Sequence, residues 1–305
     1  MPPLRETAKY VKELNEIDFW VLKNIFILSK NYERVPLQIL VSKGKFKADV
    51  IMKSIKKLHR HGFIEYFLQP YESIRLYTSG ADLLALKKFS EKGLIAGIGR
   101  QIGVGKESDI YEVIDDEGRR YSLKIFRIGR ISFRQVRVKR KYGRIDIWTS
   151  WLNRNINAAK NEYRVLKQLY LRGAPVPRPV YKIMHMILLE FLDGDILNKV
   201  KLPEKEVKKV YEIIIGYVKR IYELGYVNGD LSQFNVFVKN TGDIILIDWP
   251  QAIEVDKNEQ LARQLLIRDL KNITHYFVKT YHLNMDFISD VLSTNNFSDL
   301  IDLII

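Results

Sequence analysis

The hydrophobic pattern of residues 1–92 predicts a small helical domain that contains one hairpin. Apolar residues recur at helical spacing over 5–30, and two further helical stretches follow over 36–42 and 47–60. The segments FIEYFLQ and IRLYT, joined by PYES, have the pattern of two hairpin strands, and a last helix is expected over 79–92. Helix, turn, helix and hairpin in this order predict a winged-helix domain.

The pattern changes over residues 93–305 to short strands punctuated by glycine, followed by longer helices. Three strands are expected up to the segment YSLKIF, with a glycine turn after the first and a hairpin turn at 115–118. Helices are expected over 157–171 and 204–224, and the strand MHMILLEF lies between them. Strands and helices that alternate irregularly in this way predict an α+β fold.

Composition bounds the class of protein. The chain has 305 residues, of which 47% are hydrophobic, so it can bury the cores of two domains. It contains no cysteine, which excludes disulfides, thiolate metal sites and cysteine nucleophiles. The first residues, MPPLRETAKYVKEL, lack a signal peptide, and no run reaches the ~18 apolar residues of a membrane span. A cytoplasmic protein is expected.

The formal net charge of +14 favours a polyanionic partner. Residues 127–144, RIGRISFRQVRVKRKYGR, carry many lysines and arginines and no acid. This density of like charge is typical of a solvated loop, and it equally suits a segment that contacts a phosphate backbone and becomes ordered on binding.

A second basic surface is expected on the helix over 47–60, within the winged-helix domain. Such a helix can lie along the phosphates of DNA or RNA, although winged helices also dock proteins and basic helix faces are often only solvated. The basic residues of this segment are Lys47, Lys53, Lys56, Lys57, His59 and Arg60.

The glycine turn of the first strand pair has the composition of a phosphate-binding loop. Two glycines alone are weak support, because they are common in hairpins. The polar residues beside them are more informative, since backbone amides, a lysine and a hydroxyl can face nucleotide phosphates. The residues expected in this loop are Gly103, Val104, Gly105, Lys106, Glu107 and Ser108.

Two single charges downstream gain meaning from their order. Lys124 lies in a strand and Glu162 in a helix, where each would ordinarily be solvated. A glycine loop, a strand lysine and a helix glutamate in this order are the arrangement that clamps the α- and β-phosphates of ATP. The polar link at 190–194 could then present backbone groups of Glu190 and Leu192 to adenine.

Three oxygen-bearing side chains stand at the margins of apolar segments further along. Asp230 and Asn235 lie in YVNGDLSQFNVFV, and Asp248 follows the run DIILI. Phosphoryl transfer requires an aspartate that orients or deprotonates the nucleophile and hard oxygen ligands for magnesium. These three residues match that requirement together, so they are the candidate catalytic and metal-binding residues.

These motifs resemble the RIO family of atypical protein kinases, in its winged-helix branch known as Rio kinase two. The resemblance rests on GVGKESDIY, NGDLSQFNV and LIDWPQA, extends over essentially the whole chain, and is nearest in length to archaeal members. It implies a serine/threonine kinase or ATPase that uses ATP with Mg²⁺, or Mn²⁺, and acts in maturation of the small ribosomal subunit. Its partners would be the subunit precursor and its rRNA, which the winged helix and residues 127–144 would contact. No association with a membrane is expected.

The resemblance also implies roles for single residues. Asp230 matches the catalytic aspartate, Asn235 and Asp248 match the metal ligands, and Lys124 with Glu162 matches the ATP-clamping pair. Asp248 is further implied as the acceptor of a phosphoryl group during ATP hydrolysis.

One departure and one omission stand out against the family pattern. Asn228 stands where the family has histidine, and because asparagine also hydrogen-bonds to backbone groups we expect the loop to keep its shape. Few residues follow Asp248, so a bilobal kinase-like domain without an activation segment or peptide-binding helices is expected. Its N-lobe would span 93–190, with a flexible basic loop over 127–155, and its C-lobe 194–305.

Two other functions remain open from the residues alone. Small-molecule phosphotransferases of the aminoglycoside or choline kinase kind share the G-D-x-x-x-x-N and I-D-W arrangement, although they need neither a winged helix nor a basic loop. A nucleic-acid-binding scaffold with a degenerate kinase lobe is the second alternative. The intact Lys124, Asp230, Asn235 and Asp248 argue against it.

Overall fold

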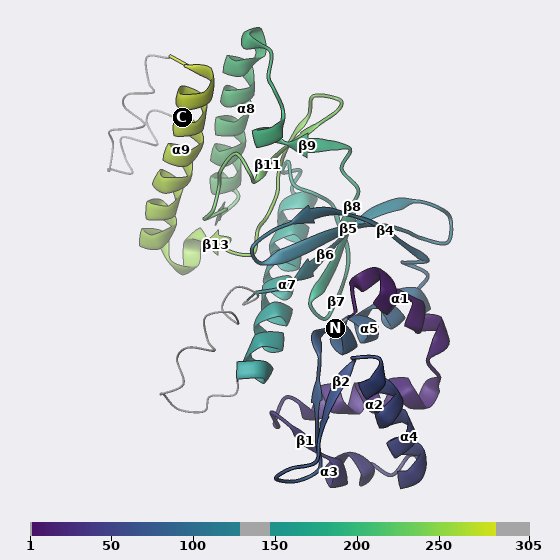
Figure 1. The fold of residues 1–305 in the computed structure, drawn as a ribbon. Helices are drawn as coiled ribbons and strands as arrows, with labels where there is room; N and C mark the ends of the chain where they lie inside the picture. Colours follow the sequence, from purple (N-terminus) through teal and green to yellow (C-terminus); the bar gives the residue numbers. More distant parts are fainter. Residues whose placement is uncertain (1, 129–146, 285–305) are drawn as a thin grey trace. The chain divides into compact units, whose positions relative to one another are not determined.

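The computed structural model describes residues 2–128 and 147–284. The chain forms two compact units (Figure 1), each of which is described by itself. The first unit comprises Met1–Ala159 with Tyr181–Leu188, and the second comprises Lys160–Val180 with Leu189–Ile305. The first unit therefore holds the predicted winged helix together with the strands that follow it, and the boundary expected at residue 92 stays a prediction.

The N-terminal part of the first unit has the predicted order of helix, turn, helix and hairpin. Strands β2 and β3 form the hairpin, and β1 adds a third strand, so that the sheet order is β1-β3-β2. Helix α5 follows the hairpin, as expected. The elements are α1 (Leu4–Glu13), α2 (Glu16–Leu28), β1 (Val35–Pro36), α3 (Leu37–Val41), α4 (Ala48–Arg60), β2 (Ile64–Phe67), β3 (Ser73–Leu76) and α5 (Thr78–Glu91).

The single helical stretch expected over 5–30 is wrong in one respect, because the structure divides it into α1 and α2. Asn15 caps the start of α2: its side chain accepts a hydrogen bond from the Asp18 amide at 3.0 Å, and the Asp18 carboxylate accepts from the Asn15 amide at 3.2 Å. In a continuous helix these two amides would donate to carbonyls of the preceding turn. The reciprocal capping satisfies them with side chains, so one helix ends and a new one begins here.

The flexible basic loop expected over 127–155 is also wrong in part. Helix α7 (Ile147–Leu171) begins well before the predicted start at residue 157. Trp151 and Leu152 are only 6% and 9% exposed and belong to the apolar core of the first unit. Two large apolar side chains make the segment helical by burying one face of it. The remainder of the expected loop, residues 129–146, lies outside the described residues.

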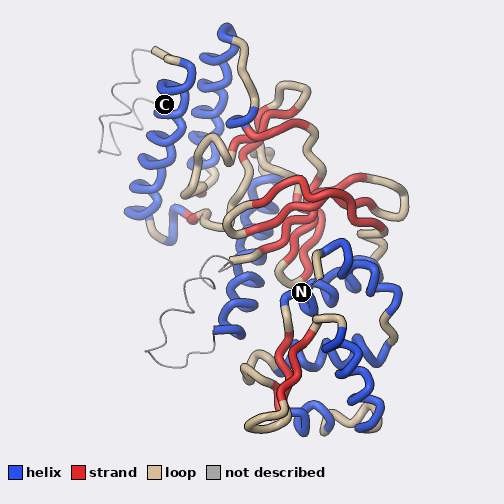
Figure 2. The backbone as a smooth tube through the Cα atoms, in the orientation of Figure 1, coloured by secondary structure: helices blue, strands red, loops and turns tan. Residues whose placement is uncertain are grey.

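A five-stranded sheet, with its strands drawn in red in Figure 2, has the order β4-β5-β6-β8-β7. The glycine turn lies between β4 and β5, and Lys124 lies on β6. The three predicted strands are confirmed, and the register of β5 and β6 sets Ile110 opposite Lys124. The strands are β4 (Gly97–Val104), β5 (Ser108–Ile114), β6 (Arg120–Phe126), β7 (Pro179–Ile183) and β8 (Met186–Glu190).

The second unit is built on two long helices, α8 (Glu204–Glu223) and α9 (Glu259–Tyr281). Buried Tyr211 of α8 and Thr274 of α9 share a hydrogen bond of 2.8 Å, which fixes the two helices against each other. Five short strands and two 3-10 turns complete the unit before α9. These are β9 (Gly194–Ile196), η1 (Leu197–Lys199), β10 (Tyr226–Val227), β11 (Val236–Lys239), β12 (Ile244–Leu246), β13 (Ile253–Glu254) and η2 (Val255–Lys257).

This topology places the predicted catalytic residues on two connections. The segment with Asp230 and Asn235 joins β10 to β11, and Asp248 follows β12. Between Asp248 and α9 the chain forms only β13 and η2, which leaves no room for a long activation segment. None of the helices in the described part of the chain is long and apolar enough to cross a membrane.

Candidate active site

The glycine loop of the first unit is a tight turn between β4 and β5. The Gly105 amide donates to the Ser108 carbonyl at 2.8 Å, which closes the turn. A side chain at position 105 would come within 3.3 Å of that carbonyl oxygen, so glycine suits the turn. Val104, Lys106 and Glu107 are exposed. The turn therefore presents its backbone and a lysine to solvent, as a phosphate-binding loop requires.

Lys124 is buried. The expectation that a lysine in a strand lies on the solvated face is therefore wrong for this residue. Its exposed fraction is 3%, and its ammonium nitrogen lies 5.2 Å from the centre of the Phe126 ring. Burial of an ammonium group costs roughly several kcal/mol unless anionic groups compensate it. The phosphate-binding role that the sequence assigns to Lys124 stays a prediction.

Asn235 is held by its amide nitrogen in the second unit. This nitrogen donates to the Asp230 carbonyl oxygen at 2.8 Å, which leaves the amide oxygen of Asn235 as the atom available to a metal ion. Asn235 is 8% exposed, whereas the Asp230 side chain is exposed. The two residues that the sequence places five apart are thus joined directly.

Asp248 has an unusual backbone conformation. Its φ angle is 65°, in the left-handed region that non-glycine residues adopt at a cost of order 1 kcal/mol or more. The following residue, Trp249, is fully buried, and its amide donates to the carboxylate of Glu162 at 3.2 Å. Glu162, which is 1% exposed, therefore helps to hold the backbone that carries Asp248.

Asn228, the departure from the family pattern, connects the two parts of the site. Its side-chain nitrogen donates to the Asp248 carbonyl at 3.1 Å, and its side-chain oxygen accepts from the Asp230 amide at 3.1 Å. The residue is 6% exposed. One amide group thus supplies the donor and the acceptor that tie Asp230 to Asp248, so the expectation that asparagine preserves the loop is supported by the geometry.

Helix α9 contributes residues that sequence reasoning did not identify. The carboxylate of Asp269 accepts from the Gly229 amide at 2.8 Å and from the Leu231 amide at 3.2 Å, the residues on either side of Asp230. Arg268 donates to the Gly229 carbonyl. Asp269 occupies a core-facing position of α9 and is 1% exposed. The only signal in the sequence was a charged residue at a helical position where the spacing of neighbouring apolar residues predicts a buried side chain.

The pKa of Asp269 follows from this environment. Burial raises it to about 7, and the negative charge of Asp230 adds to the rise. The hydrogen bonds from the Gly229 and Leu231 amides and the positive charge of Arg268 act in the opposite direction without cancelling the effect of burial.

Replacement of Asp269 by asparagine should flatten the pH dependence of stability. The folded pKa lies above the unfolded value of about 3.9, so the stability gained from protonated Asp269 is complete below pH ~4 and lost as the pH rises to ~7. Urea unfolding at several pH values measures the free energy of unfolding. Between pH ~4 and ~7 its slope against pH should be smaller in Asp269→Asn than in the wild type, by at most about 1.4 kcal/mol per pH unit. Asp256→Asn, an exposed control, should not change the slope, and equal slopes for wild type and Asp269→Asn would contradict the expectation.

Two of the polar groups of Glu190, a residue predicted to contact adenine, are already hydrogen-bonded within the protein. The Glu190 amide donates to the Arg178 carbonyl at 3.0 Å, and the Glu190 carboxylate accepts from the Arg178 amide at 2.8 Å. The Glu190 carbonyl is then the group that can accept from the amino group of adenine. Leu192 is half-buried two residues later, and its contact with adenine stays a prediction.

The oxygen atoms of this site fit a magnesium ion. No group of three His, Asp or Glu side chains that could hold a metal gathers within residues 2–128 and 147–284. Mg²⁺ usually takes one or two carboxylates, several waters and the phosphates of its substrate, so Asp248 and the Asn235 oxygen suffice on the protein side. The donor set therefore agrees with the predicted chemistry.

Comparison with known proteins gives the same picture. A family model described as "RIO domain" matches residues 109–289, and one described as "Rio2, N-terminal" matches residues 11–92. The first covers more than half of the chain. The family that the motifs indicated is confirmed, and so is the α+β fold with a winged helix followed by a kinase domain.

Individual relatives agree over nearly the full length. A serine/threonine-protein kinase rio2 of Schizosaccharomyces pombe is 34% identical over 96% of this chain and 86% of its own. The RIO-type serine/threonine-protein kinase Rio2 of Methanocaldococcus jannaschii is 35% identical over 82% and 92%. The crystal structure of a Rio2 kinase complex with ADP, Mg²⁺ and phosphoaspartate from Chaetomium thermophilum is 31% identical, with a TM-score of 0.79, and covers 94% of this chain and 88% of its own. The chain belongs to the Rio2 branch of the RIO family of serine/threonine kinases.

Proposed function

We propose that the chain is an ATP- and Mg²⁺-dependent serine/threonine kinase with ATPase activity that acts in maturation of the small ribosomal subunit. The observation that carries the proposal is the group formed by Asp230, Asn235 and Asp248, which Asn228 and Asn235 join by hydrogen bonds. The same order of motifs occurs in a family whose members are named as kinases.

The proposed roles follow from the position of each residue. The turn over 103–108 and Lys124 bind the ATP phosphates, and Glu162 supports the site through Trp249. Glu190 and Leu192 contact adenine through their backbones. Asn235 and Asp248 would hold Mg²⁺, or Mn²⁺ in its place, and the bound ion would supply positive charge against the charge that develops during transfer. Asp230 orients the attacking hydroxyl or water and accepts its proton.

Asp248 is proposed to accept the phosphoryl group in the ATPase reaction. One carboxylate oxygen of Asp248 attacks the γ-phosphorus of ATP, the bond from that phosphorus to the β,γ-bridging oxygen breaks, and ADP leaves. Water then hydrolyses the acyl phosphate and restores the carboxylate. The crystal structure of a related Rio2 kinase described as an ADP/Mg²⁺-phosphoaspartate complex supports this role.

Incubation with γ-labelled ATP and Mg²⁺ tests the proposal. Wild-type protein should release labelled phosphate or label itself, and chelation of the metal should stop both reactions. Parallel reactions with an aminoglycoside or choline test the small-molecule alternative, which would show substrate-dependent consumption of ATP. Absence of nucleotide binding and of turnover would leave only the nucleic-acid-binding scaffold.

The proposed partner is the precursor of the small ribosomal subunit with its rRNA. On α4, Lys53, Lys56 and Arg60 are exposed, which leaves their charges available to phosphates. Lys57, also expected on this surface, instead pairs with buried Asp18 at 2.7 Å and serves the core of the domain. The other proposed contact, residues 127–144, lies outside the described residues apart from its first two. A cytoplasmic location likewise stays a prediction.

Charge reversal on α4 should weaken binding to small ribosomal subunits. The pair Lys53→Glu and Lys56→Glu should reduce the slope of log K against log salt by roughly 1 to 2, because each phosphate contact contributes about 0.7 to 0.9. Lys9→Glu with Lys12→Glu makes the same charge change on the exposed side of α1 and serves as control. Equal weakening by both pairs would show that only net charge matters. The affinity for ATP should be unchanged in both.

A further inference from the structure

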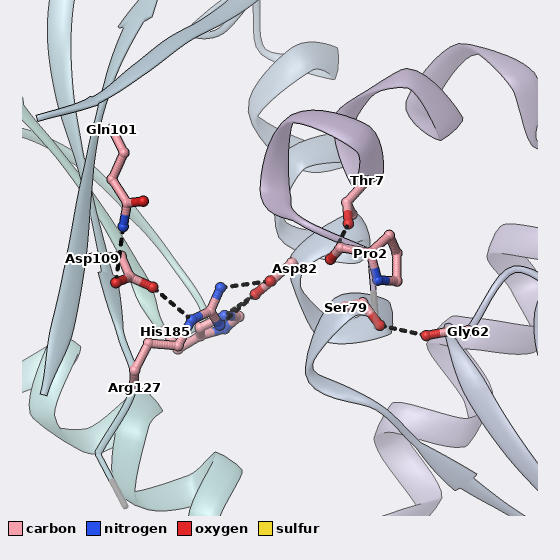
Figure 3. A network of polar contacts seen from close by, with 9 residues as sticks. All are labelled: Pro2, Thr7, Gly62, Ser79, Asp82, Gln101, Asp109, Arg127 and His185. Atoms are coloured by element: carbon pink, nitrogen blue, oxygen red, sulfur yellow. Dashed lines mark hydrogen bonds and ion pairs between the residues drawn. The ribbon is translucent and has the colours of Figure 1, made fainter. Parts of the chain in front are cut away.

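Arg127, the first residue after β6, does not belong to a solvated basic segment as the sequence suggested. Its side chain is 12% exposed, and its guanidinium forms two hydrogen bonds with the carboxylate of Asp82 on α5, at 2.8 Å and 2.6 Å (Figure 3). A planar guanidinium that meets both oxygens of one carboxylate is among the strongest polar contacts in proteins. Residue 127 thus binds the last helix of the winged helix to the end of the strand that carries Lys124.

Asp82 is fully engaged on its other side. Buried His185 lies with its Nε2 atom 2.7 Å from an Asp82 oxygen. Burial lowers the pKa of His185, so the ring is neutral near pH 7 and donates a hydrogen bond to the carboxylate. Burial of Asp82 would raise its pKa, but the charge of Arg127 and the hydrogen bonds from His185 and Arg127 outweigh it and lower the pKa to about 2. Asp82 and Arg127 are therefore an ionised pair over the whole neutral range.

The same arginine contacts the glycine loop. Its backbone amide donates to the Glu107 carbonyl at 2.6 Å, and its Nε atom lies 3.5 Å from the carboxylate of Asp109, the second residue of β5. Asp109 is 4% exposed and also accepts from the side chain of Gln101 on β4 at 3.1 Å. Both strands that flank the loop are thus connected to residue 127, as Figure 3 shows for the side chains of Gln101, Asp109, Arg127 and Asp82.

We propose that Arg127 is a positioning residue that fixes the nucleotide-binding loop over 103–108 to the winged helix through Asp82. The winged-helix domain then sets the geometry of the loop and hence the affinity for ATP. This inference rests on the proposed function, in which the loop binds the phosphates of ATP.

The physical basis is the cost of a poorly compensated buried charge. An arginine that loses its bidentate carboxylate partner in a buried site keeps only the longer contact with Asp109 at 3.5 Å, so it is destabilised there and turns its side chain toward water. Residue 127 also provides the amide that holds Glu107, so such a movement would release the end of the loop. Helix α5 would lose its connection to β6 in the same step.

Asp82→Asn tests the inference, because it keeps the shape of the side chain and removes its charge. Two measurements are made, the dissociation constant of Mg·ATP and amide hydrogen exchange over 103–108 without nucleotide. We expect roughly tenfold weaker ATP binding, the scale of coupling found between linked sites, and faster exchange in the loop. At saturating ATP, kcat should stay within about twofold, because the groups that carry out the transfer are unchanged.

Arg120→Met is the matched control. Arg120 is the first residue of β6, the strand that Arg127 follows, and it pairs with Glu112 at 2.6 Å, but its side chain is 46% exposed. Loss of an exposed pair should alter neither measurement appreciably. If Asp82→Asn does not fold, Arg127→Lys replaces it, since lysine keeps the charge and cannot meet both Asp82 oxygens, and the same two changes are expected.

The outcomes separate this inference from the proposed function. Unchanged ATP affinity and unchanged loop exchange in a folded Asp82→Asn protein would overturn the positioning role. Failure of the wild-type protein to bind Mg·ATP would overturn the proposed function instead. In that case the exchange measurement alone still decides whether Arg127 holds the loop.

Discussion

Asp230→Asn should lower kcat for phosphoryl transfer by about 10³-fold, within the range that a positioned general base contributes. The side chain of Asp230 is exposed, whereas its backbone amide and carbonyl bond to Asn228 and Asn235. The asparagine variant keeps these backbone contacts, so the fold and the dissociation constant of Mg·ATP should be unchanged. Single-turnover rates with labelled ATP and an equilibrium binding titration measure the two quantities separately.

A matched control is Asp256→Asn, which removes an exposed carboxylate of the same unit outside the site. It should retain the wild-type rate. A variant at position 230 that kept more than about a tenth of that rate would not fit a catalytic role, because general-base catalysis is worth about 10²-fold at the least. A large loss of nucleotide affinity would instead indicate a metal-binding role for Asp230.

Asp248→Asn should have the second large effect, a loss of at least about 10²-fold in turnover, the scale of removing one preorganised group that stabilises developing charge. Asparagine tolerates the left-handed conformation that Asp248 adopts, with its φ of 65°, so the backbone should remain in place. The Asp248 carbonyl can still accept from Asn228. The expected defect is therefore in metal binding and acceptor chemistry, without unfolding.

Two readouts distinguish these contributions. Mg²⁺ should raise the affinity of the wild-type protein for ADP and have little effect on the variant, since a neutral amide is a weaker ligand than a carboxylate. Protein-bound label from ATP should be released by hydroxylamine in the wild type and be absent from Asp248→Asn, as expected for an acyl phosphate. Hydroxylamine-sensitive label that persisted in the variant would place the acceptor on another residue.

Some features of this chain could be predicted because they are local. The glycine turn, the hairpin with PYES and the strands β4 to β6 depend on neighbouring residues and on periods of two and 3.6 residues, which a sequence displays directly. The motif around Asp230 and Asn235 could be recognised for the same reason, since both residues lie in one short connection. The order of these motifs was enough to indicate the family.

Other features depended on contacts between distant segments. Residues 147–155 looked like the end of a basic loop, and they are helical because Trp151 and Leu152 enter the core of the first unit. The division between α1 and α2 depended on the cap at Asn15. At this position a capped helix start competes with a continuous helix, and both satisfy the backbone hydrogen bonds, so the spacing of apolar residues does not decide between them.

The sequence by itself determined which chemistry is present: a glycine loop, a strand lysine and three oxygen donors in the order that phosphate transfer with magnesium requires. Only the tertiary structure decided what supports that chemistry. Asp269 lies 38 residues from Leu231 in the chain and Asp82 lies 45 from Arg127, yet each pair is in hydrogen-bond contact. The physical reason is that the charge of a side chain belongs to the residue, whereas its burial and its partner belong to the fold.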